Sequence, residues 1–115
     1  MATTMYTINL ELGMPTADTA IRILEGALAR ARAGQYKTVK IIHGYGSSGV
    51  GGRIKTQVGK HLTNAQKNGK IKAWCMGEEF DAFNSATQKM LSADYSLTKD
   101  RDYTRCNHGI SMVLL

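Results

Sequence analysis

The sequence feature that most restricts the possible folds of this chain is a glycine-rich segment in its first half. Five glycines fall within residues 44–52, after the apolar run 39–42 and before a helical pattern that starts near Ile54. Backbone without Cβ atoms can turn its N–H groups inward, and the start of a helix adds unpaired N–H groups and the positive end of its dipole. The sequence therefore predicts a strand-to-helix turn that holds a phosphate or another anion.

The charges around this segment are one-sided. Residues 26–77 contain ten Lys or Arg and no Asp or Glu, whereas the rest of the chain carries five basic residues and all nine acids, which gives the net charge of +6. A concentrated positive field attracts polyanions and speeds their encounter. Because a solubilising surface would scatter its lysines more evenly, the pattern favours a polyanionic partner.

Length and composition indicate a compact chain. With 115 residues, 43% of them hydrophobic, and one proline, residues 1–115 are expected to form one domain with a real core. The N-terminal residues have no secretion-signal pattern, and no apolar run reaches the roughly 20 residues of a membrane helix. Cys75 and Cys106 are too few for a disulfide scaffold. We therefore expect a cytoplasmic protein without a membrane partner.

The first half of the chain has strand and helix patterns in turn. Alternation over residues 6–12 predicts a strand with Leu10 and Leu12 on its buried side. Thr16 is expected to cap a helix that Gly34 ends. Residues 37–42 then form the second strand.

The second half predicts one long helix and two further strands. Apolar residues at helical spacing form the inner face of a helix that Gly69 ends: Ile54, Val58, Leu62 and Ala65. Residues 71–76 read as a strand, residues 80–91 as a short helix, and the polar residues 94–108 as an irregular loop. Trp74, Phe80 and Phe83 are expected in the core.

The last predicted strand, residues 110–115, is so apolar that it should be central or covered on both faces. With it, the order of elements is β-α-β-α-β-(α)-β. The predicted fold class is an α/β two-layer sandwich, with a mixed four-stranded sheet and two main helices.

Two nucleotide motifs fit the glycine-rich segment poorly. Gly44, Gly46 and Gly49 match a dinucleotide-binding fingerprint. However, the acid expected about 20 positions later is missing, since the next acid is Glu78, and the chain is too short for a complete Rossmann sheet. No Walker A lysine follows, and the three histidines lack metal-ligand spacing. We therefore expect no cofactor and no metal site.

Several residues of the segment are candidates for ligand contacts. His43 can donate to a phosphate, act as a general acid or base, or only hold the shape of the loop. Tyr45 can stack on a base or pack over the glycines. Arg53, at the start of the helix, is well placed to meet a bound phosphate, and Lys60 and Lys67 follow it at seven-residue spacing on the same side. His108, before Gly109, can be a second residue of the cleft or only a turn residue, and we favour the turn.

Three features of the chain resemble the small MutS-related (Smr) domain family. They are the stretch Ile-Ile-His-Gly-Tyr-Gly at residues 41–46, the glycines and basic helix after it, and the terminal Gly-Ile-Ser-Met-Val-Leu-Leu strand. The resemblance spans nearly the whole chain. It implies a two-layer α/β fold similar to the C-terminal domain of translation initiation factor 3. It also implies nucleic-acid binding and, in many members, endonuclease or nicking activity.

The first family motif is altered in this chain. Smr domains typically carry Leu-Asp-x-His-Gly at the end of the first strand, and the Asp and His are implicated in cleavage. In the matching residues 8–13, Asn9 or Leu10 takes the acidic position, and Glu11 or Leu12 takes that of the histidine. Glu11 can act as a base, but no partner for it is evident. The sequence thus resembles a divergent branch that keeps the binding loop.

Together these patterns predict an Smr-like domain that binds DNA or RNA with little sequence preference. The expected binding residues are His43, Gly44, Tyr45, Gly46, Gly49, Arg53, Lys55, Lys60 and Lys67. Two alternatives remain: an Smr-type endonuclease that uses His43 and Glu11 as catalytic residues, and a binder of a small phosphorylated ligand.

Overall fold

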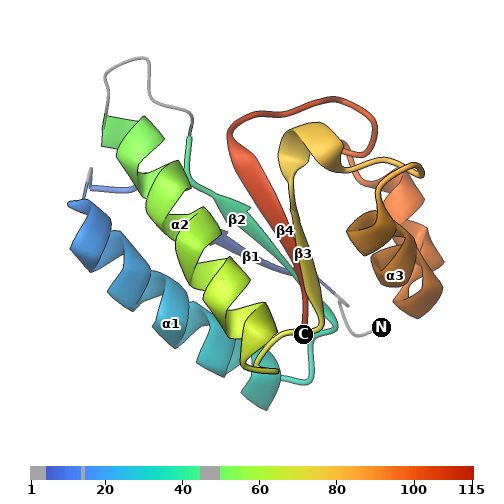
Figure 1. The fold of residues 1–115 in the computed structure, drawn as a ribbon, viewed down its shortest axis with the longest axis horizontal. Helices are drawn as coiled ribbons and strands as arrows, with labels where there is room; N and C mark the ends of the chain where they lie inside the picture. Colours follow the sequence, from blue (N-terminus) through green and yellow to red (C-terminus); the bar gives the residue numbers. More distant parts are fainter. Residues whose placement is uncertain (1–4, 14, 45–49) are drawn as a thin grey trace.

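The computed structural model describes residues 5–13, 15–44 and 50–115 and shows a four-stranded mixed sheet packed against helices (Figure 1). The elements are β1 (Met5–Asn9), α1 (Ala17–Ala33), β2 (Thr38–Ile42), α2 (Val50–Lys67), β3 (Ala73–Met76), the 3₁₀ helix η1 (Gly77–Glu79), α3 (Ser85–Ala93), the 3₁₀ helix η2 (Tyr95–Lys99) and β4 (Ile110–Leu114). The predicted order of strands and helices is confirmed. No helix among the described residues is long and apolar enough to span a membrane.

The sheet places its last strand in the middle. The strand order is β1-β2-β4-β3, with β1 parallel to β2 and β4 antiparallel to both of its neighbours. Every residue of β4 is buried, as expected for an apolar strand covered on both faces. β1 and β3 form the two edges of the sheet.

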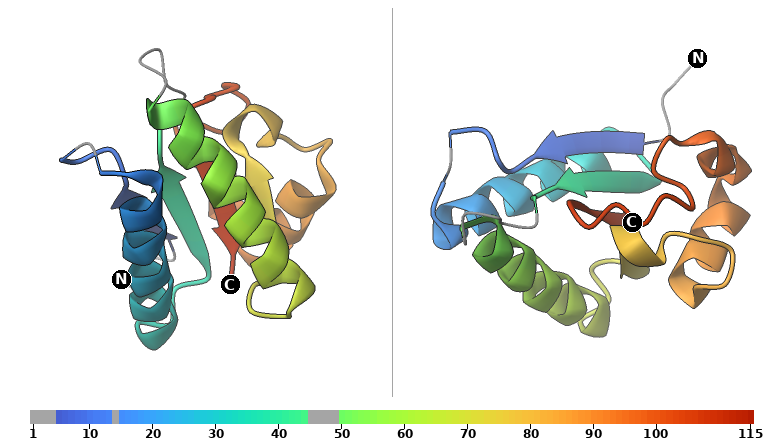
Figure 2. Two further views of the ribbon diagram at one scale, coloured as in Figure 1. Left: turned by 60° about the vertical axis from the view of Figure 1, so that its left-hand side comes forward. Right: turned by 90° about the horizontal axis from the view of Figure 1, so that it is seen from above.

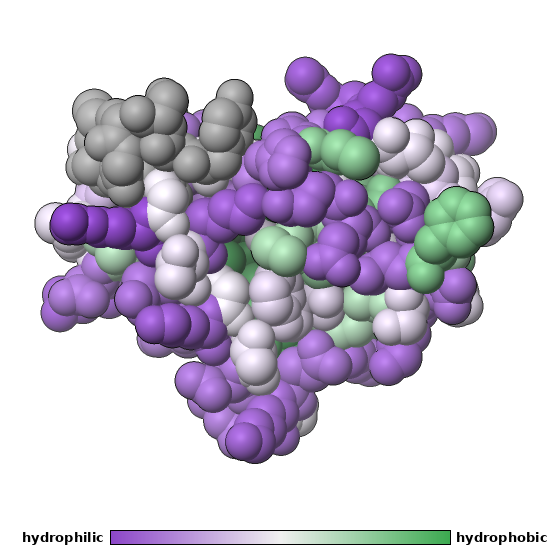
Figure 3. Space-filling model, turned by 45° about the horizontal axis from the view of Figure 1, so that its top comes forward, coloured by the Kyte–Doolittle hydropathy of each residue, from purple (hydrophilic) through white to green (hydrophobic). Residues whose placement is uncertain are grey.

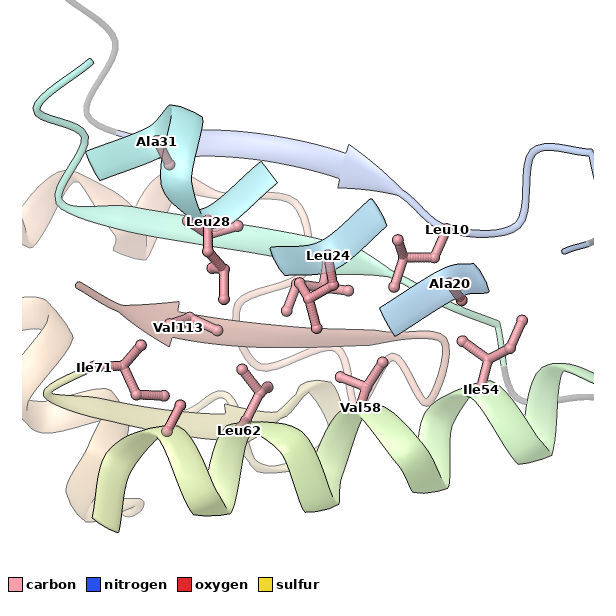
Figure 4. Close-up of a cluster of buried hydrophobic side chains, with 13 residues drawn as sticks. Leu10, Ala20, Leu24, Leu28, Ala31, Ile54, Val58, Leu62, Ile71 and Val113 are labelled. Atoms are coloured by element: carbon pink, nitrogen blue, oxygen red, sulfur yellow. The ribbon is translucent and has the colours of Figure 1, made fainter. Parts of the chain in front are cut away.

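Helices α1 and α2 cover one face of the sheet. Figure 4 shows Leu24 and Leu28 of α1 opposite Val58 and Leu62 of α2, with Val113 of β4 between them. The predicted inner face of α2 is confirmed, because all four of its residues are buried. The predicted cap of α1 is confirmed as well, since the Thr16 hydroxyl accepts a hydrogen bond from the Thr19 N–H at 3.2 Å.

The second face of the sheet is covered by α3, η2 and the segment that follows them, so α3 lies on the opposite side from α1 and α2 (Figure 2). The prediction of an irregular loop over residues 94–108 is wrong in part. Leu97 of η2 is buried, and Lys40 of β2 binds Asp100 and Asp102, each at 2.6 Å. Because a buried ammonium needs counter-charges, these polar residues belong to the interior.

Two apolar residues that the sequence placed in the core are exposed in the structure. β1 ends at Asn9, whose side chain accepts a hydrogen bond from the Glu11 N–H and turns the chain, so Leu12 is 74% exposed. Phe83 is 94% exposed, because the Asp81 carboxylate accepts from the Phe83 N–H and the helix begins only after this turn. Phe80 is buried as expected.

Candidate nucleic-acid interface

The candidate site lies where β1 and β2 end and α2 begins. Gly44 has a φ of +72°, a backbone conformation that favours glycine, and a Cβ atom there would displace the flexible end of the Glu11 side chain. The Gly44 and His43 N–H groups both donate to the Gly109 carbonyl, at 3.0 and 2.9 Å. Residues 45–49, which include Tyr45, Gly46 and Gly49 of the predicted loop, lie outside the described residues.

His43 is fully buried, with both ring nitrogens hydrogen-bonded. Nδ1 donates to the Gly44 carbonyl at 2.6 Å, which leaves Nε2 of the neutral ring to accept from the Ser111 hydroxyl at 2.9 Å. Burial lowers the pKa of His43 below its ordinary value of 6.5, against the opposing effect of the Gly44 hydrogen bond. Among the uses that the sequence left open, this geometry favours a histidine that holds the first glycine of the loop and joins β2 to β4.

Lys55, Glu78 and His108 form a cluster beside His43. The Lys55 ammonium binds the Glu78 carboxylate at 2.9 Å and the His108 carbonyl at 3.0 Å. His108 Nδ1 lies 3.0 Å from the same Glu78 oxygen, and its side chain is 60% exposed. The ammonium that the sequence assigned to phosphate binding is thus already paired with a carboxylate.

The Glu78 carboxylate is ionised at neutral pH. Burial works against ionisation, but hydrogen bonds from Lys55, its own backbone N–H and His108 outweigh it and hold the pKa of Glu78 below its ordinary value of 4.5. Its second oxygen, Oε1, is buried and has no hydrogen-bond partner among the described residues. Sequence reasoning missed this cluster, because its members are far apart in the chain and share no motif. Within the described ranges, no group of three or more His, Cys, Asp or Glu could hold a metal ion.

The outer surface of α2 carries the predicted basic residues. Arg53, Lys60 and Lys67 are exposed, and their seven-residue spacing places them on nearly the same side of the helix. α2 contains no acidic residue. The face shown in Figure 3 is mostly hydrophilic, with only separate apolar spots. These three residues therefore remain available to a polyanion, whereas Lys55 of α2 and Lys40 of β2 form internal ion pairs.

These features define an α/β protein in which a strand ends in a glycine turn beside a basic helix. The Smr domain family model matches residues 10–91, so the chain belongs to the Smr domain family. No curated protein and no solved structure matches the chain significantly. Smr domains generally bind or nick nucleic acids.

Proposed function

We propose that this Smr domain, residues 1–115, is a cytoplasmic protein that binds DNA or RNA through the phosphate backbone, with little sequence preference. The observation that carries the proposal is the charge of α2, which presents Arg53, Lys60 and Lys67 on one exposed side and has no acid to neutralise them. Such contacts attract phosphates whatever the base sequence.

The glycine turn supplies the second part of the proposed interface. Gly46, Gly49 and the start of α2 hold one phosphate with backbone N–H groups, and Tyr45 contacts the neighbouring nucleotide. Gly44 contributes through its backbone conformation, because its own N–H already donates to the Gly109 carbonyl. His43 takes part indirectly, because its hydrogen bond fixes the Gly44 carbonyl. Lys55 adds positive charge at the rim while it pairs with Glu78. The proposed binding uses no cofactor and no metal.

Binding to a labelled single strand, a duplex and a branched junction across a salt series tests the proposal. The affinity should fall as salt rises. Replacing Arg53, Lys60 and Lys67 with Ala should reduce the slope of log K against log salt by about 2 to 3, since each phosphate contact contributes roughly 0.7 to 0.9. A matched triple variant, with Ala at the exposed Lys89, Lys99 and Arg105 on the other side of the sheet, should keep the wild-type slope. Weak binding without a salt slope would contradict the proposal.

A second candidate function is Smr-type endonuclease activity. The observation in its favour is the Glu78–His108 pair, in which a carboxylate orients an exposed imidazole, as a general acid or base requires. Against the lowering effect of burial, Glu78 and Glu11 both lie close enough to His43 to raise its pKa electrostatically. Supercoiled plasmid and structured RNA would be incubated with the wild type and with His43→Ala, Glu11→Gln and His108→Ala. As a binding module, the wild type should leave both substrates intact. Cleavage that one of these substitutions abolishes would favour the enzyme instead.

A further inference from the structure

A groove with a volume of about 540 Å³ runs between α2 and the edge strand β3. Its lining includes Gly59, Lys60, Thr63 and Asn64 of α2 and Trp74 and Met76 of β3. α2 passes alongside β3 in Figure 1. No residue of the glycine turn lines the groove. Of the residues expected to bind phosphate, the groove shares only Lys55 and Lys60, which lie at its rim.

The alternation of β3 and one glycine create this groove. Ala73 and Cys75 of β3 are buried in the core with α3, whereas Trp74 and Met76 are partly exposed on the α2 side. A Cβ atom at Gly59 would lie 3.5 Å from Cη2 of the Trp74 indole. The tip of the indole therefore packs against helix backbone, at a position where a longer side chain would occupy the groove.

The charges beside the groove favour a polyanion over a peptide. Lys60 lines the groove, and Arg53 and Lys67 lie seven residues away on either side, which places each of them roughly 10 Å from Lys60 along the helix axis. Among the described residues that line the groove none is acidic, and Lys55 at its rim is the one that pairs with Glu78. A half-buried aromatic ring next to such a row of cations is the combination that binds single-stranded nucleic acids.

We propose that this groove binds an unpaired nucleobase of single-stranded DNA or RNA, with the base stacked on the Trp74 indole and the adjoining phosphates along Lys60 and its neighbouring cations. This inference rests on the proposed nucleic-acid binding and names its preferred ligand. A base inside a duplex keeps both faces covered by its neighbours, so only an unstacked base presents a face to the indole. Thr63 and Asn64 offer polar groups to the edge of the base.

The only tryptophan of the chain is Trp74, so its fluorescence reports the groove directly. The chain of residues 1–115 is titrated at low salt with 12-nucleotide oligo(dT) and oligo(U), and with a duplex of the same length. Single strands should quench the emission and bind several-fold more tightly than the duplex, and the bound duplex should leave the emission nearly unchanged. Because Trp74→Ala removes the intrinsic fluorophore, its binding is measured with a labelled oligonucleotide. The substitution should weaken single-strand binding about tenfold or more.

Gly59→Gln tests the groove without altering Trp74. Its side chain fills the groove, and glutamine is a better helix former than glycine, so the variant should fold. It should lose the preference for single strands. Gly26→Gln is the matched control, because Gly26 is also a helix-interior glycine but lies in α1, where an added Cβ atom meets only the flexible end of Arg30. This control should bind like the wild type.

The outcomes separate this inference from the proposed function. The groove is not the base site if Gly59→Gln and Gly26→Gln bind single strands equally and a saturating single strand leaves the Trp74 emission unchanged. If salt-dependent binding persists in that case, the proposed phosphate binding stands. If no oligonucleotide binds at any salt concentration, both proposals fall.

Discussion

At the scale of single residues, His43 combines a recognisable motif position with an interior environment. The sequence places it at the mouth of an anion loop, and the structure buries it between the Gly44 carbonyl and the Ser111 hydroxyl. A ring in this setting is neutral at pH 7 and has no proton to spare for a phosphate. Its hydrogen bonds instead determine where the chain leaves β2.

The lowered pKa of His43 predicts a pH-dependent stability. The unfolded chain takes up a proton near pH 6.5, whereas the folded chain takes it up only at lower pH, so the unfolded state binds more protons in that window. The contribution of His43 is complete above pH 6.5 and declines as the pH falls below it, by at most about 1.4 kcal/mol per pH unit. Urea denaturation of the wild type and His43→Gln at pH 7.5, 6.5 and 5.5 should show the two free energies of unfolding converging toward low pH. Parallel curves would contradict this prediction.

The motif revealed which residue types begin the loop, but not their surroundings. His43 and Gly44 are evident from sequence because a strand, a histidine and glycines are contiguous. Their partners Ser111 and Gly109 are more than 60 positions away and become neighbours only through the pairing of β2 with β4. The cluster of Glu78 with Lys55 and His108 could not be predicted either, because these residues are also distant in the sequence and meet only in the fold.

At the scale of elements, the segment after α3 does more than connect it to β4. η2 contributes Leu97 to the second core, and the turn after it brings two carboxylates to Lys40. Hydrogen bonds from Asn107 and Lys40 outweigh the effect of burial and hold the pKa of Asp102 below its ordinary value. The segment therefore closes one face of the sheet with charges as well as apolar side chains.

Removing the buried Lys40 ammonium alone should lower the free energy of unfolding more than removing all three charges of its ion-pair network. Lys40→Ala leaves Asp100 and Asp102 buried without their counter-charge, and we expect a loss of about 3–5 kcal/mol in the free energy of unfolding. The combined variant Lys40→Met, Asp100→Asn and Asp102→Asn should lose less, because no unpaired charge remains. Urea denaturation at pH 7 measures both. Lys99→Ala, an exposed lysine of the same segment, should be near neutral, and an equally small effect of Lys40→Ala would disprove the role assigned to the pair.

Regular periodicity explains which elements could be predicted. The inner face of α2 repeats at helical spacing, so its buried residues follow from sequence. The extents of β1 and α3 did not follow, because the side chains of Asn9 and Asp81 form local hydrogen bonds that compete with regular structure. The ion pairs that help to close the second face were missed, because they join residues about 60 positions apart and have no period.

At the scale of the whole molecule, the sheet separates the exposed basic surface of α2 from a buried ion-pair network. The basic surface of α2 and its groove lie on one side, and the acidic residues Asp100 and Asp102 are used internally on the other. The apolar terminal strand was correctly predicted to be central, because a strand with no polar face must be covered twice. The family match, residues 10–91, ends before this strand.

A chain cut after Leu91 should fail to fold, although it retains the matched region. It loses β4, the only link between β2 and β3 in the sheet, so the two cores lose their shared strand. Circular dichroism and urea titration should show no cooperative transition for residues 1–91, in contrast to the full chain. Adding a synthetic peptide of residues 92–115 should restore part of the transition. Cooperative unfolding of the truncated chain alone would show that β4 is dispensable.

The central position of β4 also governs when the protein can fold during its synthesis. β1, α1, β2, α2 and β3 leave the ribosome before the strand that joins them, and β2 cannot pair with β4 until Leu114 has emerged. Until then β3 has no strand partner, and the apolar faces of α1 and α2 cover only β1 and β2. Until β4 emerges, the nascent domain therefore exposes hydrophobic surface and an unpaired strand, the two features that make folding intermediates prone to aggregate.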